Sequence, residues 1–183
     1  MYLLDAFFTH LVNAFSGSSF LADNLMIWIS AAGVPVIVLT VAGQWWRRTD
    51  RYHVRHVLVA SGLSFMLGLA INQLILLDFA RVRPYDANVT HLLISPSADP
   101  SFPSDHATAT FALASIFLLY GLRRLGSLYL AAAFLVAISR VYVGTHYISD
   151  VIGGAATGLS AALTVRFFYR EGTRIDRLIT RIF

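Results

Sequence analysis

The sequence contains no cysteine and no lysine, and charged residues make up only 13% of its 183 positions. Without cysteine, the chain has neither a disulfide framework nor a cysteine-based metal site. Without lysine, every permanently positive side chain is an arginine. Hydrophobic residues account for 57% of the chain, and this polarity is too low for an ordinary soluble domain.

Long hydrophobic runs take the place of the missing charge. Several of them reach or approach the roughly 17–25 residues that a membrane-spanning helix requires. The expected spans are 24–45, 57–79, 107–122, 125–143 and 147–168. The third is short. The sequence therefore predicts an all-α integral membrane protein, in which residues 1–183 form one helical bundle of five to six transmembrane helices.

The N-terminal segment, residues 1–20, has an amphipathic pattern instead of a long apolar run. Its apolar side chains share one helical face, formed by Leu4, Phe8, Leu11 and Phe15. We expect an interfacial helix here, with a short inserted sixth helix as the alternative. No basic segment precedes the apolar residues, and Asp5 lies there instead, so we expect no cleaved signal peptide.

Most of the arginines gather in three regions, which predict the orientation. These are the loop after the first expected span, the loop after the third, and a basic amphipathic tail at 169–183. By the positive-inside rule all three are cytoplasmic, and the tail is expected to bind anionic lipid. The segment 1–20, the loop 80–106 and the connection 144–146 then face the opposite side of the membrane.

Glycine and proline mark expected bends and contacts within the spans. Gly33 and Pro35 interrupt the first span and predict a kink. Gly154 and Gly158 form a small-xxx-small face in the last span, which favours close packing against another helix.

Three polar clusters fall at the outer boundary of the predicted bundle. They are "RVRPY" at 81–85, "PSDH" at 103–106 and "SRVYVGTHYISD" at 139–150. The first closes the second span, the second opens the third span, and the last connects the fourth and fifth. Charges at a membrane boundary are costly unless they have partners, so this concentration indicates a functional site.

Arginines in two of these clusters suit phosphate binding. Arg83 and Arg140 each place a guanidinium near a helix end, and this planar group binds phosphate oxygens with two parallel hydrogen bonds. The alternative is that both side chains extend to lipid headgroups. For Arg81, extension to lipid headgroups is the favoured interpretation.

The second cluster has the pattern of a helix N-terminus. Ser104 or Asp105 is suited to cap the helix, and the free backbone N–H groups there form an anion site. Capping alone is the alternative. It gives no reason for His106, which could donate a proton to the leaving oxygen of a bound phosphate.

His146 and Asp150 are four residues apart at the start of a helix, and hence on one face. A carboxylate that accepts a hydrogen bond from one imidazole nitrogen leaves the other as a nucleophile or base. Metal ligation is the competing hypothesis, with His106, His146, Asp105 and Asp150 as ligands. It is disfavoured because arginines share the site, which indicates an anionic guest and no metal.

Together the clusters resemble the three-part signature of the type-2 phosphatidic acid phosphatase family, whose superfamily includes vanadium haloperoxidases and bacterial acid phosphatases. The match consists of Arg83-Pro84, Pro103-Ser104-x-His106 and Ser139-Arg140-x5-His146-x3-Asp150. The resemblance implies a helical phosphatase without a metal or other cofactor. His146 would attack phosphorus, Asp150 would orient His146, and His106 would protonate the leaving group and then activate water. The phosphate oxygens would be bound by Arg83, Arg140 and Ser104.

Two positions depart from the family pattern. The first motif usually begins with a lysine seven residues before its arginine, and this chain has Leu76 there. We therefore include Arg81 as a candidate substitute for that phosphate-binding cation. Where the second motif often has glycine, this chain has Asp105, which suits a helix N-terminus but repels phosphate at close range. We include Asp105 among the candidate residues of the phosphate site.

"FPSDHAT" and "RVYVGTHYISDVIGG" resemble the undecaprenyl-diphosphatase branch of that family. The expected substrate is a polyprenyl diphosphate at the outer face of a bacterial plasma membrane, with membrane lipids and no nucleic acid as partners. Phosphatidylglycerophosphate, phosphatidic acid and lipid A phosphate are alternative substrates. A protein that only binds or moves phospholipid is the alternative of another class. It would need the arginines but not the His146–Asp150 pair.

Overall fold

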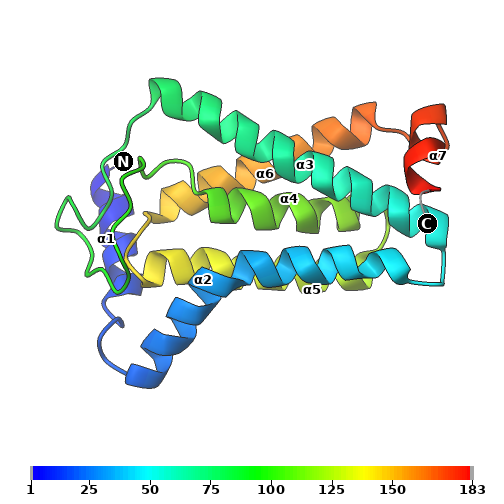
Figure 1. The fold of residues 1–183 in the computed structure, drawn as a ribbon. Coiled ribbons are helices and arrows are strands. Elements are labelled where there is room, and N and C mark those ends of the chain that lie inside the picture. Colours follow the sequence, from blue (N-terminus) through cyan, green and yellow to red (C-terminus); the bar gives the residue numbers. More distant parts are fainter. Residues whose placement is uncertain (1, 182–183) are drawn as a thin grey trace.

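Five long helices run side by side in one bundle in the computed structural model, and a short helix lies at each end (Figure 1). The structure describes residues 2–181, and this part of the chain contains no strand. The helices are α1 (Tyr2–Asn13), α2 (Phe20–Gly43), α3 (Arg51–Asp78), α4 (Asp105–Leu119), α5 (Arg123–Tyr142), α6 (Ile148–Phe168) and α7 (Arg174–Thr180), with a 3₁₀ turn η1 (Gln44–Trp46) after α2.

The bundle confirms the predicted all-α membrane fold. Helices α3, α5 and α6, and α2 together with η1, are long and apolar enough to span a bilayer, whereas α4 is shorter, with 15 residues. Each predicted span corresponds to one helix. The largest difference is at the start of α3, which begins at Arg51 and not at residue 57.

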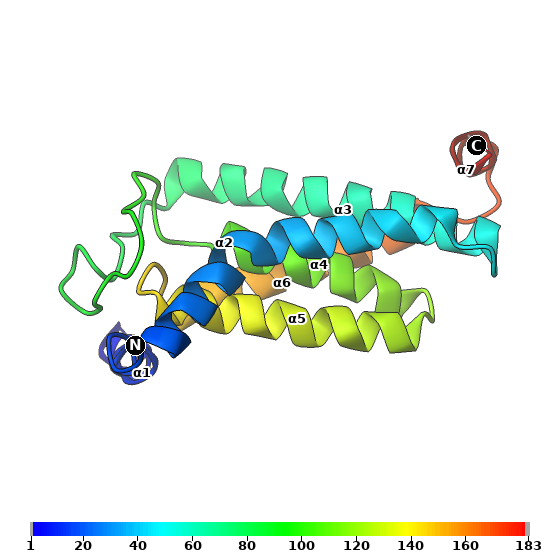
Figure 2. The same ribbon diagram turned by 60° about the horizontal axis from the view of Figure 1, so that its bottom comes forward.

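Helix α4 occupies the centre of the bundle and contacts α3, α5 and α6 (Figure 2). Its small residues Ala107, Ala112 and Ala114 are fully buried. A Cβ atom added at Gly154 would lie 2.4 Å from the Ser104 carbonyl oxygen, and one at Gly158 would lie 2.5 Å from that of Thr108. The predicted glycine face therefore packs against α4, because small residues let helix backbones approach closely in a bilayer.

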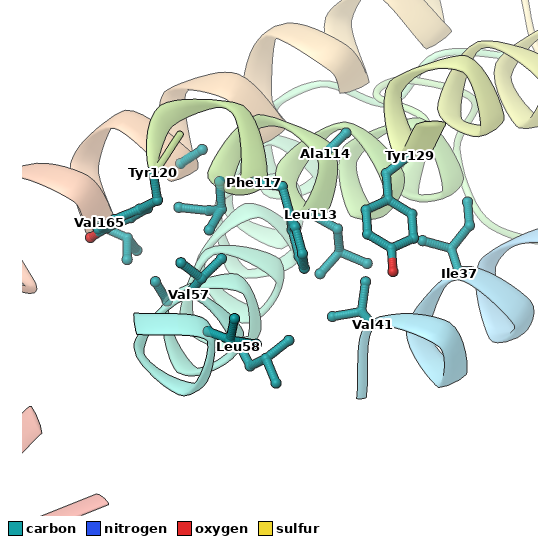
Figure 3. Packing of buried hydrophobic residues seen from close by; sticks show 14 of the residues in the cluster. Ile37, Val41, Val57, Leu58, Leu113, Ala114, Phe117, Tyr120, Tyr129 and Val165 are labelled. Carbon is teal, nitrogen blue, oxygen red and sulfur yellow. The ribbon is translucent and has the colours of Figure 1, made fainter. Parts of the chain in front are cut away.

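The largest apolar cluster among the described residues joins five helices, α2 to α6 (Figure 3). The rings of Phe117 on α4 and Tyr129 on α5 meet edge to face, with centroids 4.8 Å apart. Val41 from α2 and Leu58 from α3 complete the contact. This packing holds α4 at a fixed depth, so that its N-terminus stays at the end that carries the polar motifs.

At that same end, α1 lies across the bundle and not along it (Figure 1). Leu4, Phe8 and Leu11 are exposed, whereas Thr9 and Asn13 are buried against the protein. The apolar face of α1 is therefore turned away from the protein, and its polar face is turned toward it. Helix α2, which follows, contains Pro35 and bends along its length (Figure 1).

The opposite end is closed by α7, which docks on α3. Asp176 is buried and accepts hydrogen bonds from His56 Nδ1 and the Tyr169 hydroxyl, each at 2.7 Å. Arg174, Arg177 and Arg181, which belong to the predicted basic tail, are exposed. Residues 182–183 of that tail lie outside the described residues.

Candidate active site

A cavity of about 220 Å³ lies at the α1 end of the bundle, among α3, the N-terminus of α4 and the C-terminal part of α5. Five of the residues predicted from the sequence line it: Arg83, Asp105, His106, Arg140 and His146. The other lining residues are Gln73, Leu76, Ser97, Asp99, Pro100 and Pro103. The fold thus brings the three sequence motifs to one cavity.

Backbone contacts between the motifs hold this cavity in shape. The Ser104 N–H donates to the Asp150 carbonyl at 3.1 Å, which ties the start of α4 to the start of α6. Between α5 and α6 the chain turns at Gly144, where φ is +87° and an added Cβ would lie 2.4 Å from the His91 carbonyl oxygen. Only glycine fits this turn, and the turn positions His146.

His146 is buried and is oriented by a backbone carbonyl. Its Nδ1 lies 2.8 Å from the Ser101 carbonyl oxygen, which can only accept, so Nδ1 carries the proton. That leaves Nε2 as the nitrogen with a free lone pair. Burial lowers the pKa of His146, and the positive charges of Arg140 and Arg83 lower it further against the opposing effect of Asp150.

Asp150 acts on His146 at a longer distance than expected. Its Oδ2 is 3.6 Å from His146 Nδ1, and it accepts hydrogen bonds from the Ser101 hydroxyl at 2.5 Å and the Tyr147 N–H at 2.8 Å. Ser101 therefore connects both members of the pair: its carbonyl binds His146 and its hydroxyl binds Asp150. Sequence reasoning missed Ser101, because a serine in an irregular loop carries no signal of its own.

The arginines Arg83 and Arg140 are buried, with exposed fractions of 7% and 8%, so neither side chain extends to lipid headgroups. Arg83 donates from Nε to the Asp99 carbonyl at 2.8 Å and from Nη1 to the Thr145 carbonyl at 3.0 Å. Arg140 donates from Nη1 to the Ser30 hydroxyl on α2. Within residues 2–181, the Nε of Arg140 has no hydrogen-bond partner.

The N-terminus of α4 contributes two further predicted residues. Ser104 is fully buried at the N-cap position, but its hydroxyl caps nothing and finds no partner in the described part of the chain. Capping therefore does not explain Ser104. Asp105 accepts a hydrogen bond from Asn72 Nδ2 at 2.6 Å, which holds its carboxylate toward α3.

Arg81, a predicted phosphate-binding residue, is not among the residues that line the cavity. Its Nη1 donates to Asp150 Oδ1 and its Nη2 to Asp5 Oδ2, both at 2.6 Å, so its guanidinium lies behind Asp150. Leu76 does line the cavity, and so does Gln73, one turn earlier on α3. The position of the family lysine thus faces the cavity here without a cation.

The residues present fit an anion better than a metal ion. No group of three or more His, Asp or Glu side chains in metal-binding proximity occurs among residues 2–181. Two guanidinium groups lie beside the imidazoles instead. A cation would have to share the cavity with both arginines, whereas an oxyanion would pair with them.

The chain also resembles known proteins over most of its length. The chain is 33% identical to the undecaprenyl-diphosphatase BcrC of Bacillus subtilis (strain 168) over 94% of its own length and 88% of that protein. Its fold is similar to the crystal structure of Aquifex aeolicus LpxE, with a TM-score of 0.70, 21% identity and coverage of 88% and 93% of the two chains.

A second solved structure, a transmembrane PAP2-type phosphatidylglycerolphosphate phosphatase from Bacillus subtilis, matches with a TM-score of 0.63 and 26% identity. The match covers 94% of this chain and 88% of the Bacillus subtilis chain. The sequence pattern of the PAP2 superfamily matches residues 57–173, which include all three motifs. The chain belongs to the PAP2 superfamily.

Proposed function

We propose that this lipid phosphatase hydrolyses a polyprenyl diphosphate, undecaprenyl diphosphate in particular, to the monophosphate. The relationship to BcrC over nearly the whole chain supports this substrate class. The cavity lies at the end of the bundle, where a headgroup would enter while the prenyl chain stays among the apolar helices.

The observation that carries the proposal is a pair of buried donors without acceptors. Arg140 lines the cavity, and Ser104 directly precedes the lining residue Asp105. The Arg140 Nε and the Ser104 hydroxyl are both buried, and neither has a partner within the described chain. A buried unsatisfied donor costs about 1–3 kcal/mol, so a site that retains two of them is suited to a guest that supplies oxygen acceptors. A phosphate group supplies them, and Arg83 and Arg140 supply the balancing positive charge.

In the first step His146 Nε2 attacks the terminal phosphorus. The new N–P bond replaces the bond from phosphorus to the bridging oxygen, and the electron pair of the broken bond leaves with the polyprenyl monophosphate. His106, at the start of α4, donates a proton to that leaving oxygen. Asp150 stabilises the imidazole ring of His146 as it becomes positive, and the Ser101 carbonyl keeps the ring oriented.

In the second step water hydrolyses the phosphohistidine. His106, now neutral, takes a proton from the water as its oxygen attacks phosphorus. The N–P bond breaks, inorganic phosphate forms, and His146 regains its free lone pair. No step requires a metal ion, because arginine donors hold the phosphate oxygens throughout.

The arrangement in the membrane follows from the positions of the arginine-rich regions. They lie at the end of the bundle opposite the cavity: η1 and the start of α3, the α4–α5 turn, and α7 (Figure 1). By the positive-inside rule that end is cytoplasmic. The cavity then opens at the extracytoplasmic side of a bacterial inner membrane.

Phosphate release from a panel of lipids tests the proposal. The purified protein should release phosphate from undecaprenyl diphosphate faster than from phosphatidylglycerophosphate, phosphatidic acid or lipid A phosphate, and its activity should persist in EDTA. His146→Ala should lower kcat by more than about 100-fold, because loss of proton transfer alone costs roughly 10²- to 10⁴-fold. Its thermal unfolding in detergent should match wild type.

Three outcomes would contradict parts of this scheme. A faster rate on phosphatidylglycerophosphate would reassign the substrate but leave the chemistry intact. Retention of phospholipid binding without any turnover by the wild type would favour the binding protein over the enzyme. Rescue of EDTA-treated protein by added metal would replace the anion site with a metal site.

A further inference from the structure

Helix α1 presents a polar stripe to the loop that carries His146. The stripe consists of Asp5, Thr9 and Asn13, each four residues from the next. Thr9 Oγ1 accepts from the Ile148 N–H at 3.0 Å, and Asn13 Nδ2 donates to the Tyr142 carbonyl at 2.8 Å. The helix is thus hydrogen-bonded to the end of α5 and the start of α6.

Asp5 contributes a charge to this contact as well as hydrogen bonds. Its Oδ1 accepts from the Ser149 N–H at 3.0 Å, and its Oδ2 accepts from the Ser149 hydroxyl at 2.5 Å. Oδ2 also pairs with Arg81 Nη2 at 2.6 Å. Burial alone would raise the pKa of Asp5, but the bonds from Ser149 and Arg81 outweigh it, so the pKa is lowered and the carboxylate is charged.

Arg81 joins this carboxylate to the one behind the nucleophile. Its Nη1 pairs with Asp150 Oδ1 at 2.6 Å, and its guanidinium lies 3.9 Å from the centre of the Tyr147 ring. The Asp150 side chain is fully buried, while those of Arg81 and Asp5 are 17% and 12% exposed. One positive group therefore bridges two negative groups, and the trio carries a net charge of one negative unit at neutral pH.

We propose that Asp5 is a positioning residue for catalysis: it shares the positive charge of Arg81 and thereby sets how strongly Asp150 stabilises His146 during phosphoryl transfer. The inference rests on the proposed function in one respect, the assignment of His146 as the nucleophile. It gives α1 a part in the reaction although no residue of α1 lines the cavity.

The physical reason is the charge balance behind His146. The ring of His146 becomes positive when Nε2 attacks phosphorus, and the negative charge of Asp150 stabilises it. Arg81 offsets that charge if it pairs with Asp150 alone. With Asp5 present, the trio retains one net negative charge; without it, the remaining Arg81–Asp150 pair is neutral. In a buried site with a low dielectric, this one-unit difference in net charge strongly affects the positive charge that develops on the His146 ring.

Kinetics with the lipid substrate give the first readout. Asp5→Asn keeps the size of the side chain and removes its charge, and it should lower kcat about tenfold or more, as expected for loss of a charge-assisted interaction, while KM changes little. The double variant Asp5→Asn/Arg81→Gln should lose no more than the worse single variant, because Asp5 acts through Arg81.

Asn13→Ala is the matched control for helix docking. Asn13 bonds the other end of the α1 stripe to the protein but does not contact Arg81 or Asp150. If Asp5 merely fastens α1, the two variants should lower kcat and Tm in parallel. That parallel loss, or a purely additive double variant, would overturn the proposal. A larger loss of kcat in Asp5→Asn at equal Tm is the expected result.

The titration of the His146 ring gives a second readout that needs no substrate. Arg83, Arg140 and His106 face this ring from the cavity side, and Asp150 with Arg81 lies behind it. Asp5→Asn leaves Arg81 less balanced and should lower the pKa of His146 further. Arg81→Gln removes a positive charge and should raise it.

Histidine NMR measures the direction of the His146 pKa shift in each variant. The His146 resonance is assigned by its loss in His146→Ala. Simple loosening of the site would move the pKa of His146 toward its solvent value in both variants, and such a common direction would overturn the proposal. A wild-type protein that hydrolyses no phosphorylated lipid would defeat the proposed function instead, and the opposite shifts would still be observable.

Discussion

At the scale of the residue, the two arginines of the cavity have different partners. Arg83 is bound to the carbonyl oxygens of Asp99 and Thr145, which belong to two different loops. Arg140 contacts the Ser30 hydroxyl and keeps its Nε without a partner in the described chain. Arg83 therefore has a structural as well as an electrostatic part, whereas Arg140 has donor capacity for a ligand.

Lysine substitutions should separate these two parts. Arg140→Lys keeps the charge but loses the planar pair of donors, so kcat/KM should fall about 10- to 150-fold, as expected for one lost charge-assisted hydrogen bond, with little change in Tm. Arg83→Lys should lower both kcat/KM and Tm. Arg177→Lys, at an exposed arginine of α7, is the control, and a near-normal rate for Arg140→Lys would remove Arg140 from phosphate binding.

The lowered pKa of His146 predicts the acidic limb of the pH profile. The nucleophile must be neutral, and burial with Arg140 and Arg83 disfavours its protonation. The limb of kcat/KM that reports His146 should therefore lie below the ordinary histidine pKa of about 6.5. Because the Asp150 carboxylate favours the protonated ring, Asp150→Asn should move the limb to still lower pH. An upward shift in that variant would contradict the assignment.

At this scale the sequence indicates the residues that line the cavity better than it indicates the residues that hold them in place. Five motif residues line the cavity as a group because their spacing is tied to helix ends, which the hydrophobic pattern locates. Ser101 and Asp5 act through contacts between segments far apart in the chain, and no local pattern marks such contacts. The same reason explains Arg81: its two carboxylate partners lie 76 and 69 positions away.

At the scale of the element, the contact between α4 and α6 sets the distance between the two histidines. His106 is in the first turn of α4 and His146 just precedes α6. The two helices approach closely where Gly154 meets the Ser104 carbonyl. A change in this packing should therefore be felt in the active site and not only in stability.

Gly154→Ala tests this coupling. The added methyl group would lie 2.4 Å from the Ser104 oxygen, so the helices must separate, and overpacking of this kind costs about 1–3 kcal/mol. Both Tm in detergent and kcat/KM should fall. Gly62→Ala on α3 is the matched control, because a Cβ there meets no atom within 4 Å. Equal behaviour of the two variants would show that the close approach is dispensable.

The limits of helix prediction in this chain have identifiable causes. The start of α3 is polar, with His53 and His56, and a hydropathy pattern therefore omits it. In the structure these histidines are paired with Glu171 and Asp176, which come from the C-terminal segment. The predicted amphipathic character of α1 agrees with its exposed apolar face, but the use of its polar stripe depends on tertiary contacts.

At the scale of the whole molecule, the two ends of the bundle have opposite chemistry. One end holds the cavity and α1, and the other holds the basic loops and α7 (Figure 1). The docking of α7 through Asp176 keeps the exposed arginines of the tail at the basic end. A bilayer that binds this end through anionic lipid would place the cavity at the far surface.

The absence of cysteine makes this orientation directly testable, because any introduced cysteine is the sole thiol of the chain. Ser95, in the loop before α4, and Thr49, between η1 and α3, are both exposed and lie at opposite ends of the bundle. A membrane-impermeant maleimide added to intact bacterial cells whose outer barrier is permeable should label Ser95→Cys. Thr49→Cys should be labelled only after the inner membrane is opened.

Each variant serves as the control for the other, since both thiols are accessible once the membrane is disrupted. Labelling of Thr49→Cys alone in intact cells would reverse the orientation and place the cavity in the cytoplasm. A polyprenyl diphosphate in the outer leaflet would then be out of reach of His146, whatever the activity in detergent. The positive-inside rule predicts the first result, because arginines concentrate in short loops next to the spans at the Thr49 end.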